Sequence, residues 1–586
     1  MNTEWSLDIL YKGFEDKNYK EDREALLKLT EQIITFSETL KDSQDEEANL
    51  IKAIGYLEEY QVLGNKIVYY LMLRQAVNTS DGQVVNELNW VEKLFSEASK
   101  AMAVIHKMIA SIENYDAYME KYPKLKAYEY LINEMKKEAA HLLSDDVEEV
   151  IAKLNISAGS AWSSMHSFLT STLEVNYRGE IITLPQVRNL AYSEDATVRK
   201  DAYEAELAAY EKIKDAISYA LNNIKTQVNT ICGLRGYKSP LEMTLAQSKM
   251  KKETLDAMLE AIREYLPIFR KYMKHKAKLL GHSNGLPWYD MFAPMGESHT
   301  KYSLEEAREF LVKHFREFSD DLADMVEQAF DEEWIDFYPR KGKVGGAFCE
   351  NMPFAKQSRV LTNYDGELGS IVTLAHELGH AYHGLNIQEH LPLNTEYSMP
   401  VAETASTFNE ALIMEAAISE SSGNEKMALI ESQLQDVTQI MVDIYSRFLF
   451  ESEVFEKCET GFLFADELND IMLNAQKTAY GDGLDPETLH PYMWTLKGHY
   501  YSESLSFYNF PYAFGGLFAR GLYEKYKIEG EEFLPKYRAL LNATTVRSVE
   551  DVAREAGIDL EDSQFWRISL QSIEKLVDQF IEITTI

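Results

Sequence analysis

At 586 residues the chain is long enough for two or more packed units, and 45% of its residues are hydrophobic, as in ordinary globular proteins. Its net charge is −36, so phosphates would be repelled, which argues against nucleic acid or an anionic membrane as the main partner. Three cysteines are too few for a disulfide framework, and their odd number favours a reducing compartment.

The sequence shows no pattern typical of export or membrane insertion. Residues 1–16 lack a basic stretch followed by an apolar one. No uncharged apolar run reaches the roughly 18 residues that a membrane-spanning helix needs. By elimination, we expect a cytoplasmic protein without a membrane partner.

Most of the chain is predicted to be helical. Glycine and proline, which break helices, account for only 28 and 14 residues. Apolar residues recur at helical spacing over 22–40, 201–224 and 251–273. The composition and this periodicity predict a mainly α fold.

Two segments depart from the helical pattern. Residues 172–184 alternate around Arg178 and Gly179 and predict a β-hairpin. Residues 334–364 contain two strand-like runs, DFYPR and SRVLTNY, between glycine-rich turns. We place a domain boundary after the hairpin, which predicts an N-terminal helical domain over 1–190 and a second domain over 191–586.

The strongest chemical signal is the sequence HELGH at 376–380, an H-E-x-x-H pattern within a helical segment. Positions i and i+4 lie on one helix face, so His376 and His380 can bind one Zn²⁺. Glu377 would then lie beside the open coordination position and take a proton from metal-bound water. Chance predicts this pattern about 0.03 times in such a chain, so an amphipathic helix with surface histidines is the weaker interpretation.

A catalytic zinc site needs a third protein ligand and a position left for water. The metzincin pattern fails, because it requires glycine and histidine at 383 and 386, where the chain has His383 and Asn386. We expect a helix to begin at Ser398 with Pro400 in its first turn. Glu403 would lie one turn inside this helix, on an apolar face where a carboxylate is costly unless paired or bound to metal. We therefore predict Glu403 as the third ligand.

Other carboxylates of this region receive different roles. Glu410 lies seven residues after Glu403 on the same predicted face and is expected to orient His380 or His376. Glu396 and Glu389 compete with Glu403 as ligands, but as loop carboxylates they are expected to point into water.

Residues 346–351, GAFCEN, are similar to a G-x-M-E-N element with which one aminopeptidase family holds a substrate amino terminus, but are one residue longer. We favour a strand edge near the cleft instead. Backbone groups of 345–348, which include Gly346 and Ala347, or of 359–364 could then pair with an extended peptide.

The aromatic stretch at 498–516 is ambiguous by itself, because such runs often belong to a core. A zinc peptidase, however, needs donors that stabilise the oxyanion of the tetrahedral intermediate. The polar members able to supply them are His499, Tyr501, Tyr508 and Tyr512.

Four parts of the sequence together resemble the M3 metallopeptidases, the thimet oligopeptidase and oligoendopeptidase F group, and most closely its bacterial oligoendopeptidase F branch. They are HELGHAYH (376–383), ETASTFNE (403–410), the stretch 499–512 and GGAFC (345–349). The resemblance is specific over about 340–520, whereas the first 190 residues match only in being helical.

The resemblance implies a two-lobed helical shell around a deep substrate channel, with a small β-sheet next to the zinc-binding helix and short oligopeptides as substrates. By motif position it implies one Zn²⁺ per chain, held by His376, His380 and Glu403, with Glu377 as general base. Ser406 belongs to the E-x-x-S-x-x-x-E part of the match and is expected near the site.

The resemblance further implies that His499 and one tyrosine stabilise the transition state. Gly515 stands where the thimet oligopeptidase branch carries another tyrosine three residues beyond a Tyr-x-x-x-Tyr pair. The choice between Tyr508 and Tyr512 therefore stays open.

The sequence thus predicts a zinc endopeptidase that cuts oligopeptides, with 191–586 as its catalytic domain. One alternative is an exopeptidase on the same zinc site, with Glu350 holding a free amino terminus. Another is a non-catalytic helical binding protein whose H-E-x-x-H sequence is accidental. The oligomeric state is not predicted.

Overall fold

The structure is a computed structural model that describes residues 2–296 and 300–585. It is 71% helix and 4% strand, which confirms the predicted mainly α fold with small sheets. In the part of the chain that the structure describes, every helix is too short or too polar to cross a membrane.

The chain forms two compact units, each built from three separated stretches. Unit 1 contains Met1–His141, His299–Ile413 and Glu529–Ala556; unit 2 contains Leu142–Ser298, Met414–Ile528 and Gly557–Ile586. The units are defined by packing. The boundary expected after residue 190 rests only on the interruption of the helical sequence pattern by the hairpin, and it stays a prediction.

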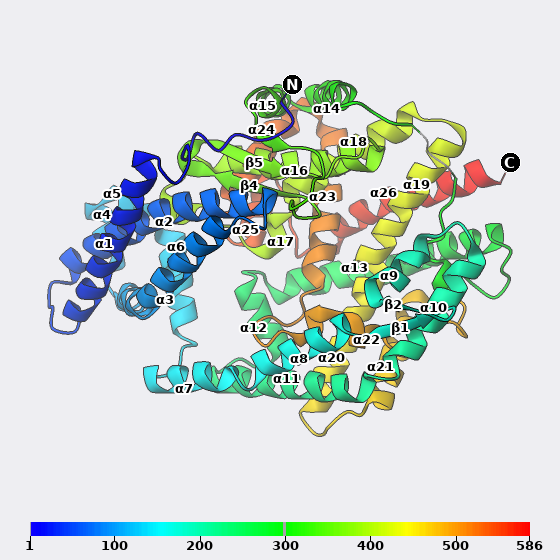
Figure 1. Cartoon of the computed structure of the whole chain (residues 1–586), viewed down its shortest axis with the longest axis horizontal. Helices are drawn as coiled ribbons and strands as arrows, with labels where there is room; N and C mark the ends of the chain where they lie inside the picture. Colours follow the sequence, from blue (N-terminus) through cyan, green and yellow to red (C-terminus); the bar gives the residue numbers. More distant parts are fainter. Residues whose placement is uncertain (1, 297–299, 586) are drawn as a thin grey trace. The chain divides into compact units, whose positions relative to one another are not determined.

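Unit 1 combines helices with one sheet (Figure 1). Its elements are α1 (Lys17–Thr39), α2 (Glu46–Val77), α3 (Gly82–Ser111), α4 (Tyr115–Lys121), α5 (Pro123–Lys126), α6 (Glu129–Ala139), α14 (Leu304–Phe318), α15 (Asp320–Asp331), β3 (Ile335–Asp336), β4 (Phe348–Met352), β5 (Gln357–Leu361), α16 (Leu368–Ile387), α17 (Met399–Ala402), the start of α18 (Thr404–Glu420), α24 (Leu534–Ala543) and α25 (Val549–Glu555). Strands β4 and β5 both pack against α16 (Figure 1).

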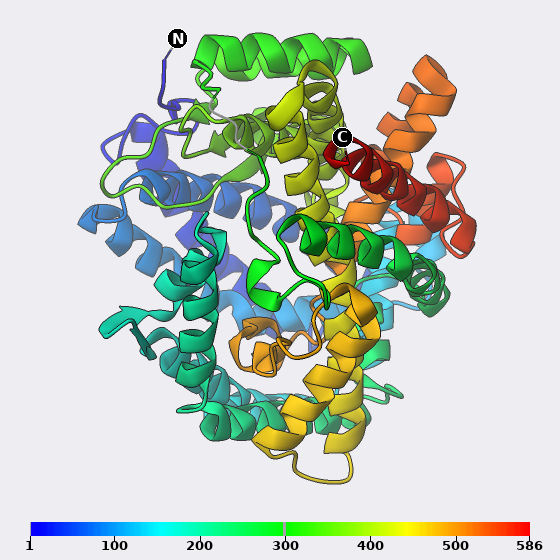
Figure 2. The same ribbon diagram turned by 90° about the vertical axis from the view of Figure 1, so that its right-hand side faces the viewer.

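Unit 2 is helical apart from one hairpin. Its elements are α7 (Asp145–Asn155), α8 (Gly159–Ser171), β1 (Glu174–Tyr177), β2 (Glu180–Thr183), α9 (Leu184–Asn189), α10 (Ala196–Tyr210), α11 (Lys214–Leu234), α12 (Pro240–Gln247), α13 (Lys252–Leu279), α19 (Gly423–Thr438), a π-helical turn (Gln439–Asp443), α20 (Ile444–Cys458), α21 (Ala465–Tyr480), α22 (Met493–Leu496), α23 (Phe510–Glu529) and α26 (Ser563–Thr584). The C-terminal helix α26 lies along α13 (Figure 2).

The three segments with helical periodicity are all helical, but one of them is interrupted. Residues 22–40 lie almost entirely in α1, and residues 251–273 lie almost entirely in α13. Residues 201–224 split into α10 and α11, and Ile213 caps the second helix with φ −120° and ψ −12°. Tyr210 and Ile213 are buried across the break. The apolar spacing therefore continues through the break between α10 and α11, so the periodicity of the sequence did not reveal this break.

The predicted hairpin is confirmed. Strands β1 and β2 pair antiparallel from Glu174 opposite Thr183 to Tyr177 opposite Glu180. The two residues between them, Arg178 and Gly179, have φ of 50° and 88°, as a tight two-residue hairpin loop requires.

The second predicted β region forms a three-stranded sheet in the order β3-β5-β4. Strand β5 is parallel to β3 and antiparallel to β4, so β4 lies at the edge. The expectation that 359–364 offers a free edge is wrong. The backbone N–H groups of Val360, Thr362 and Tyr364 already donate to carbonyls within 334–337.

The run DFYPR forms a strand only at its first residue, so its prediction as a strand is wrong beyond Asp336. Arg340 and Lys343 approach the Asp336 carboxylate to 2.7 and 2.6 Å, respectively. Asp336 is buried, and these two cations compensate its charge. They draw the chain back toward Asp336, which ends the strand.

Candidate metal centre

Helix α16 holds both histidines of the H-E-x-x-H sequence. Its apolar residues Ile371, Leu374 and Leu378 are fully buried, so packing fixes the helix in the core of unit 1. His376 and His380 lie one turn apart, with ring centroids separated by 4.9 Å. The expected sharing of one helix face is confirmed.

Glu403 lies between two helices rather than inside one, so the predicted continuous helix is wrong here. Helix α17 ends before Glu403, which has φ −93° and ψ 13°, and α18 begins after it. The Thr404 hydroxyl donates to the Val401 carbonyl at 2.8 Å, a local bond that competes with continued helix. The expected start with Pro400 in the first turn is confirmed, although the Ser398 side chain makes no capping hydrogen bond.

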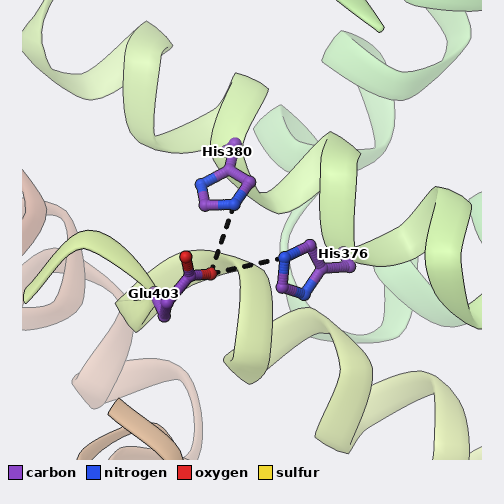
Figure 3. Close-up of side chains that lie close together, drawn as sticks. All are labelled: His376, His380 and Glu403. Carbon is purple, nitrogen blue, oxygen red and sulfur yellow. Dashed lines mark ion pairs between the residues drawn. The ribbon is translucent and has the colours of Figure 1, made fainter. Parts of the chain in front are cut away.

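The structure brings Glu403 to the two histidines (Figure 3). Its Oε2 atom lies 3.3 Å from Nε2 of His376 and 3.3 Å from Nε2 of His380. One donor atom from each residue falls within 4.8 Å of the others. Two atoms bound at ~2.1 Å to a tetrahedral zinc ion lie about 3.4 Å apart, so the three side chains fit such an ion.

Two further side chains hold this group. Nδ1 of His376 lies 2.9 Å from Oε1 of Glu410, and the Ser406 hydroxyl donates to Oε2 of Glu403 at 2.6 Å. Of the two histidines that Glu410 was expected to orient, the structure therefore pairs it with His376. An Nδ1–H bond to Glu410 leaves the Nε2 lone pair of His376 for a metal ion.

The electrostatics of the group favour a bound cation. Burial lowers the pKa of His376, but hydrogen bonds with Glu403 and Glu410 outweigh it and raise the pKa to about 10. Burial raises the pKa of Glu403, but its bonds to both histidines pull the pKa far below the usual range. Burial raises the pKa of the neighbouring Glu377. Donor atoms that attract positive charge this strongly suit a divalent ion in place of the protons.

The other two histidines of this region do not join the group. His383 is buried, places Nε2 2.8 Å from the Thr544 hydroxyl and stacks on Tyr397 at 4.3 Å. Burial lowers its pKa to about 3, so it stays neutral. Nε2 of His390 lies 2.9 Å from the backbone oxygen of Asn542.

The two competing carboxylates also lie outside the group. Glu389 is largely exposed and pairs with Lys356. Glu396 is exposed on the loop before α17. Both point toward water, as expected for loop carboxylates.

The edge strand β4 is attached to α16 through Asn351, the last residue of the GAFCEN element. Asn351 donates from Nδ2 to the backbone oxygen of His380 at 3.1 Å. Gly346 and Ala347 lie just before β4, and the Gly346 carbonyl accepts a 2.8 Å bond from Asn363. The prediction of a small sheet next to this helix is confirmed. The sequence did not predict this hydrogen bond, because the partner of Asn351 is a backbone atom.

Gly379 marks a close approach of α16 to the start of α18. A Cβ added at Gly379 would lie 2.5 Å from both the Ala405 oxygen and the Ser406 Cα, which are backbone atoms. We expect Gly379→Ala to push α18 away, to weaken metal binding and to lower stability by about 1–3 kcal/mol. Thermal unfolding with and without zinc measures both effects.

The matched control for this prediction is Gly369→Ala on the same helix, where a Cβ would meet no atom within 4 Å. It should unfold like the wild type. A Gly379→Ala protein with unchanged melting temperature and metal affinity would contradict the close packing.

In unit 2, His499, Tyr508 and Tyr512 form one aromatic group. The ring of His499 lies 5.0 Å from that of Tyr508, edge-on, and 5.9 Å from that of Tyr512, stacked. Burial, with the charges of Arg447 and Lys497, lowers the pKa of His499. Both tyrosines are thus neighbours of His499, and proximity does not choose between them.

Tyr501 is placed differently from the other tyrosine candidates. It is 1% exposed, its hydroxyl donates to the Trp494 carbonyl at 2.9 Å, and its ring stacks on His166 at 3.7 Å. Its only O–H is therefore already used inside the core of unit 2. This bond leaves the Tyr501 hydroxyl no proton to donate to an oxyanion.

Two protein-family models match parts of the chain. The model of peptidase family M3 matches residues 189–572, which is more than half of the chain. A second model, described as Oligopeptidase F, matches residues 110–174, so the similarity also reaches into the first 190 residues.

Curated relatives match over nearly the whole chain. Oligopeptidase PepF of Bacillus subtilis is 24% identical over 592 residues, which cover 99% of this chain and 87% of the relative. An oligoendopeptidase F homolog of Lactococcus lactis is 26% identical over 612 residues, covering 99% of this chain and 98% of the relative.

Solved structures share the fold. Oligoendopeptidase-F from Enterococcus faecium has a TM-score of 0.71 at 20% identity, covering 97% of this chain and 99% of its own. A protein from Chlamydophila abortus has a TM-score of 0.83 at 19% identity, covering 98% of each chain.

Proposed function

The chain belongs to peptidase family M3 and is a metallopeptidase, and on this premise we propose that it is a zinc endopeptidase that cuts internal bonds of short oligopeptides. The observation that carries the proposal is the group of His376, His380 and Glu403, whose donor atoms have the spacing that one tetrahedral ion requires. We propose zinc because two imidazole nitrogens and one carboxylate, with a position left for water, are a donor set of catalytic zinc.

The roles of the chain's own residues follow from this assignment. When bound, the metal supplies a Lewis acid that polarises the scissile carbonyl and lowers the pKa of water. Glu377, which is buried next to His376, takes the proton of the attacking water at its carboxylate and passes it to the departing amine. Glu410 holds His376 through Nδ1, which keeps the ring in a fixed orientation.

The oxyanion donors belong to the same proposal. On motif position we assign this role to His499 together with Tyr508 or Tyr512. The ring contacts of both tyrosines with His499 support the assignment.

Substrate and compartment complete the proposal. We propose oligopeptides as partners and a cytoplasmic location. All three cysteines are free thiols, which suits a reducing compartment. The net charge of −36 argues against nucleic acid as a partner.

An internally quenched peptide blocked at both ends tests the proposal. We expect the zinc-loaded protein to cut it at an internal bond, which mass spectrometry of the products locates, and a chelator to stop the reaction until zinc is restored. Only an endopeptidase accepts a substrate without free ends.

Two other results would contradict the proposal. Cleavage confined to peptides with a free amino terminus would favour the exopeptidase, in which Glu350 on β4 holds that terminus. Purified protein without stoichiometric metal, and without activity when zinc is added, would favour a binding protein.

A further inference from the structure

A buried ion pair in unit 2 connects α11 to α20. Nζ of Lys225 lies 2.7 Å from Oε1 of Glu451, and both side chains are only 1% exposed. Burying two charges is costly, and such a pair is retained only when good geometry and further hydrogen bonds satisfy it. The further bonds of Glu451 therefore indicate what the pair holds in place.

Both further donors to Glu451 come from the residues that flank Tyr508. The backbone N–H of Phe507 donates to Oε1 at 3.1 Å, and Nδ2 of Asn509 donates to Oε2 at 3.0 Å. One carboxylate thus binds the chain immediately before and immediately after Tyr508. Phe507 and Asn509 are themselves buried.

The turn at Tyr508 is strained. Phe507 has φ 53°, a left-handed conformation that is unfavourable for a bulky side chain. The N–H of Asn509 returns to the Phe507 carbonyl at 2.6 Å, so the chain reverses direction within three residues. Strain of this kind persists only where surrounding contacts enforce it, and it concentrates at functional sites.

Packing holds the flanks of the turn, while Tyr508 itself stays partly exposed. The ring of Phe507 stacks on that of Phe455 at 5.4 Å, and Nζ of Lys225 lies 4.5 Å above the same Phe455 ring. The Tyr508 ring meets His499 edge-on. The anchored backbone therefore fixes where the Tyr508 hydroxyl is presented.

We propose that Glu451, held by Lys225, is a positioning residue that sets Tyr508 for stabilising the oxyanion. The inference rests on the proposed function, and it selects Tyr508 over Tyr512 for that role. Glu451 does not contact substrate in this proposal; it acts through the turn.

A second buried pair in the same unit provides the comparison. Lys276 pairs with Glu431, and their side chains are 0% and 3% exposed. Glu431 accepts further bonds from Tyr272 and Gln435, which lie within the regular helices α13 and α19. This pair thus resembles Lys225–Glu451 in burial and chemistry but holds no strained turn.

Two changes test the proposal in the full-length, zinc-loaded protein. Lys225→Met with Glu451→Gln removes both charges together, so neither partner is left uncompensated, and Asn509→Ala removes only the bond that follows Tyr508. For each we expect kcat to fall about 10–100-fold, as for a misplaced catalytic group. KM should change by less than about threefold, and the zinc content should stay at one per chain.

The control Lys276→Met with Glu431→Gln should lower thermal stability comparably and leave kcat unchanged. In a Tyr508→Phe background, Asn509→Ala should cause no further loss of kcat, because both changes remove the same function. In a Tyr512→Phe background it should still reduce kcat. Multiplied losses with Tyr508→Phe, or an unchanged kcat for Asn509→Ala alone, would overturn the proposal.

Hydrogen exchange gives a readout that needs no catalysis. The Phe507 amide should exchange faster in Asn509→Ala than in the wild type, and an equal rate would also count against the proposal. Cleavage of the blocked peptide by the wild type is measured first. If the wild type cuts the blocked peptide and Asn509→Ala has an unchanged kcat, only the positioning role is overturned. If the wild type is inactive, the proposed function and this inference are both overturned.

Discussion

Glu377→Gln should keep the metal and reduce kcat by about 10²–10⁴-fold or more, because the amide cannot accept the proton of the attacking water. The substitution preserves size, and Glu377 is not among the three side chains whose donor atoms converge. Zinc content measured by elemental analysis should therefore remain at one per chain. Steady-state kinetics on the blocked peptide should show the loss in kcat rather than in KM.

The matched control is Glu389→Gln. Glu389 follows Glu377 in the sequence, but its carboxylate is exposed and pairs with Lys356 outside the metal group. Its removal should leave kcat unchanged. Near-normal turnover of Glu377→Gln, with metal bound, would remove Glu377 from the mechanism.

Glu403→Ala should weaken zinc binding by more than about 100-fold, since even the loss of an outer partner of a ligand commonly costs 10–100-fold. Only the two imidazoles would remain, and the affinity of the group depends on all three donors. Competition with a chromogenic chelator measures the dissociation constant. Thermal unfolding gives a second measure, because zinc should raise the melting temperature of the wild type and not that of Glu403→Ala.

The zinc affinities of two further variants serve as comparisons for Glu403→Ala. Glu410→Gln changes a side chain that contacts His376 but not the ion, so its affinity should fall between those of the wild type and Glu403→Ala. Glu396→Gln, on an exposed loop, should bind zinc like the wild type. Loss of zinc from Glu396→Gln together with retention by Glu403→Ala would mean that the third ligand is wrongly assigned.

The local part of the metal centre was predictable from the sequence. His376 and His380 converge because a helix has 3.6 residues per turn, a property of the backbone that needs no distant contact. A different argument pointed to Glu403, since a carboxylate among apolar residues requires a partner. Apolar periodicity and low glycine and proline content likewise indicated the mainly α fold.

Relations between distant segments were decided only by the tertiary structure. Glu410 meets His376 and β5 is an inner strand, because each outcome depends on which segments pack together. The Lys225–Glu451 pair shows most clearly what the sequence could not predict, since 226 residues separate its members along the chain. Spacing along a helix is determined by the backbone alone, whereas contacts across the fold are determined by the packing of the whole chain.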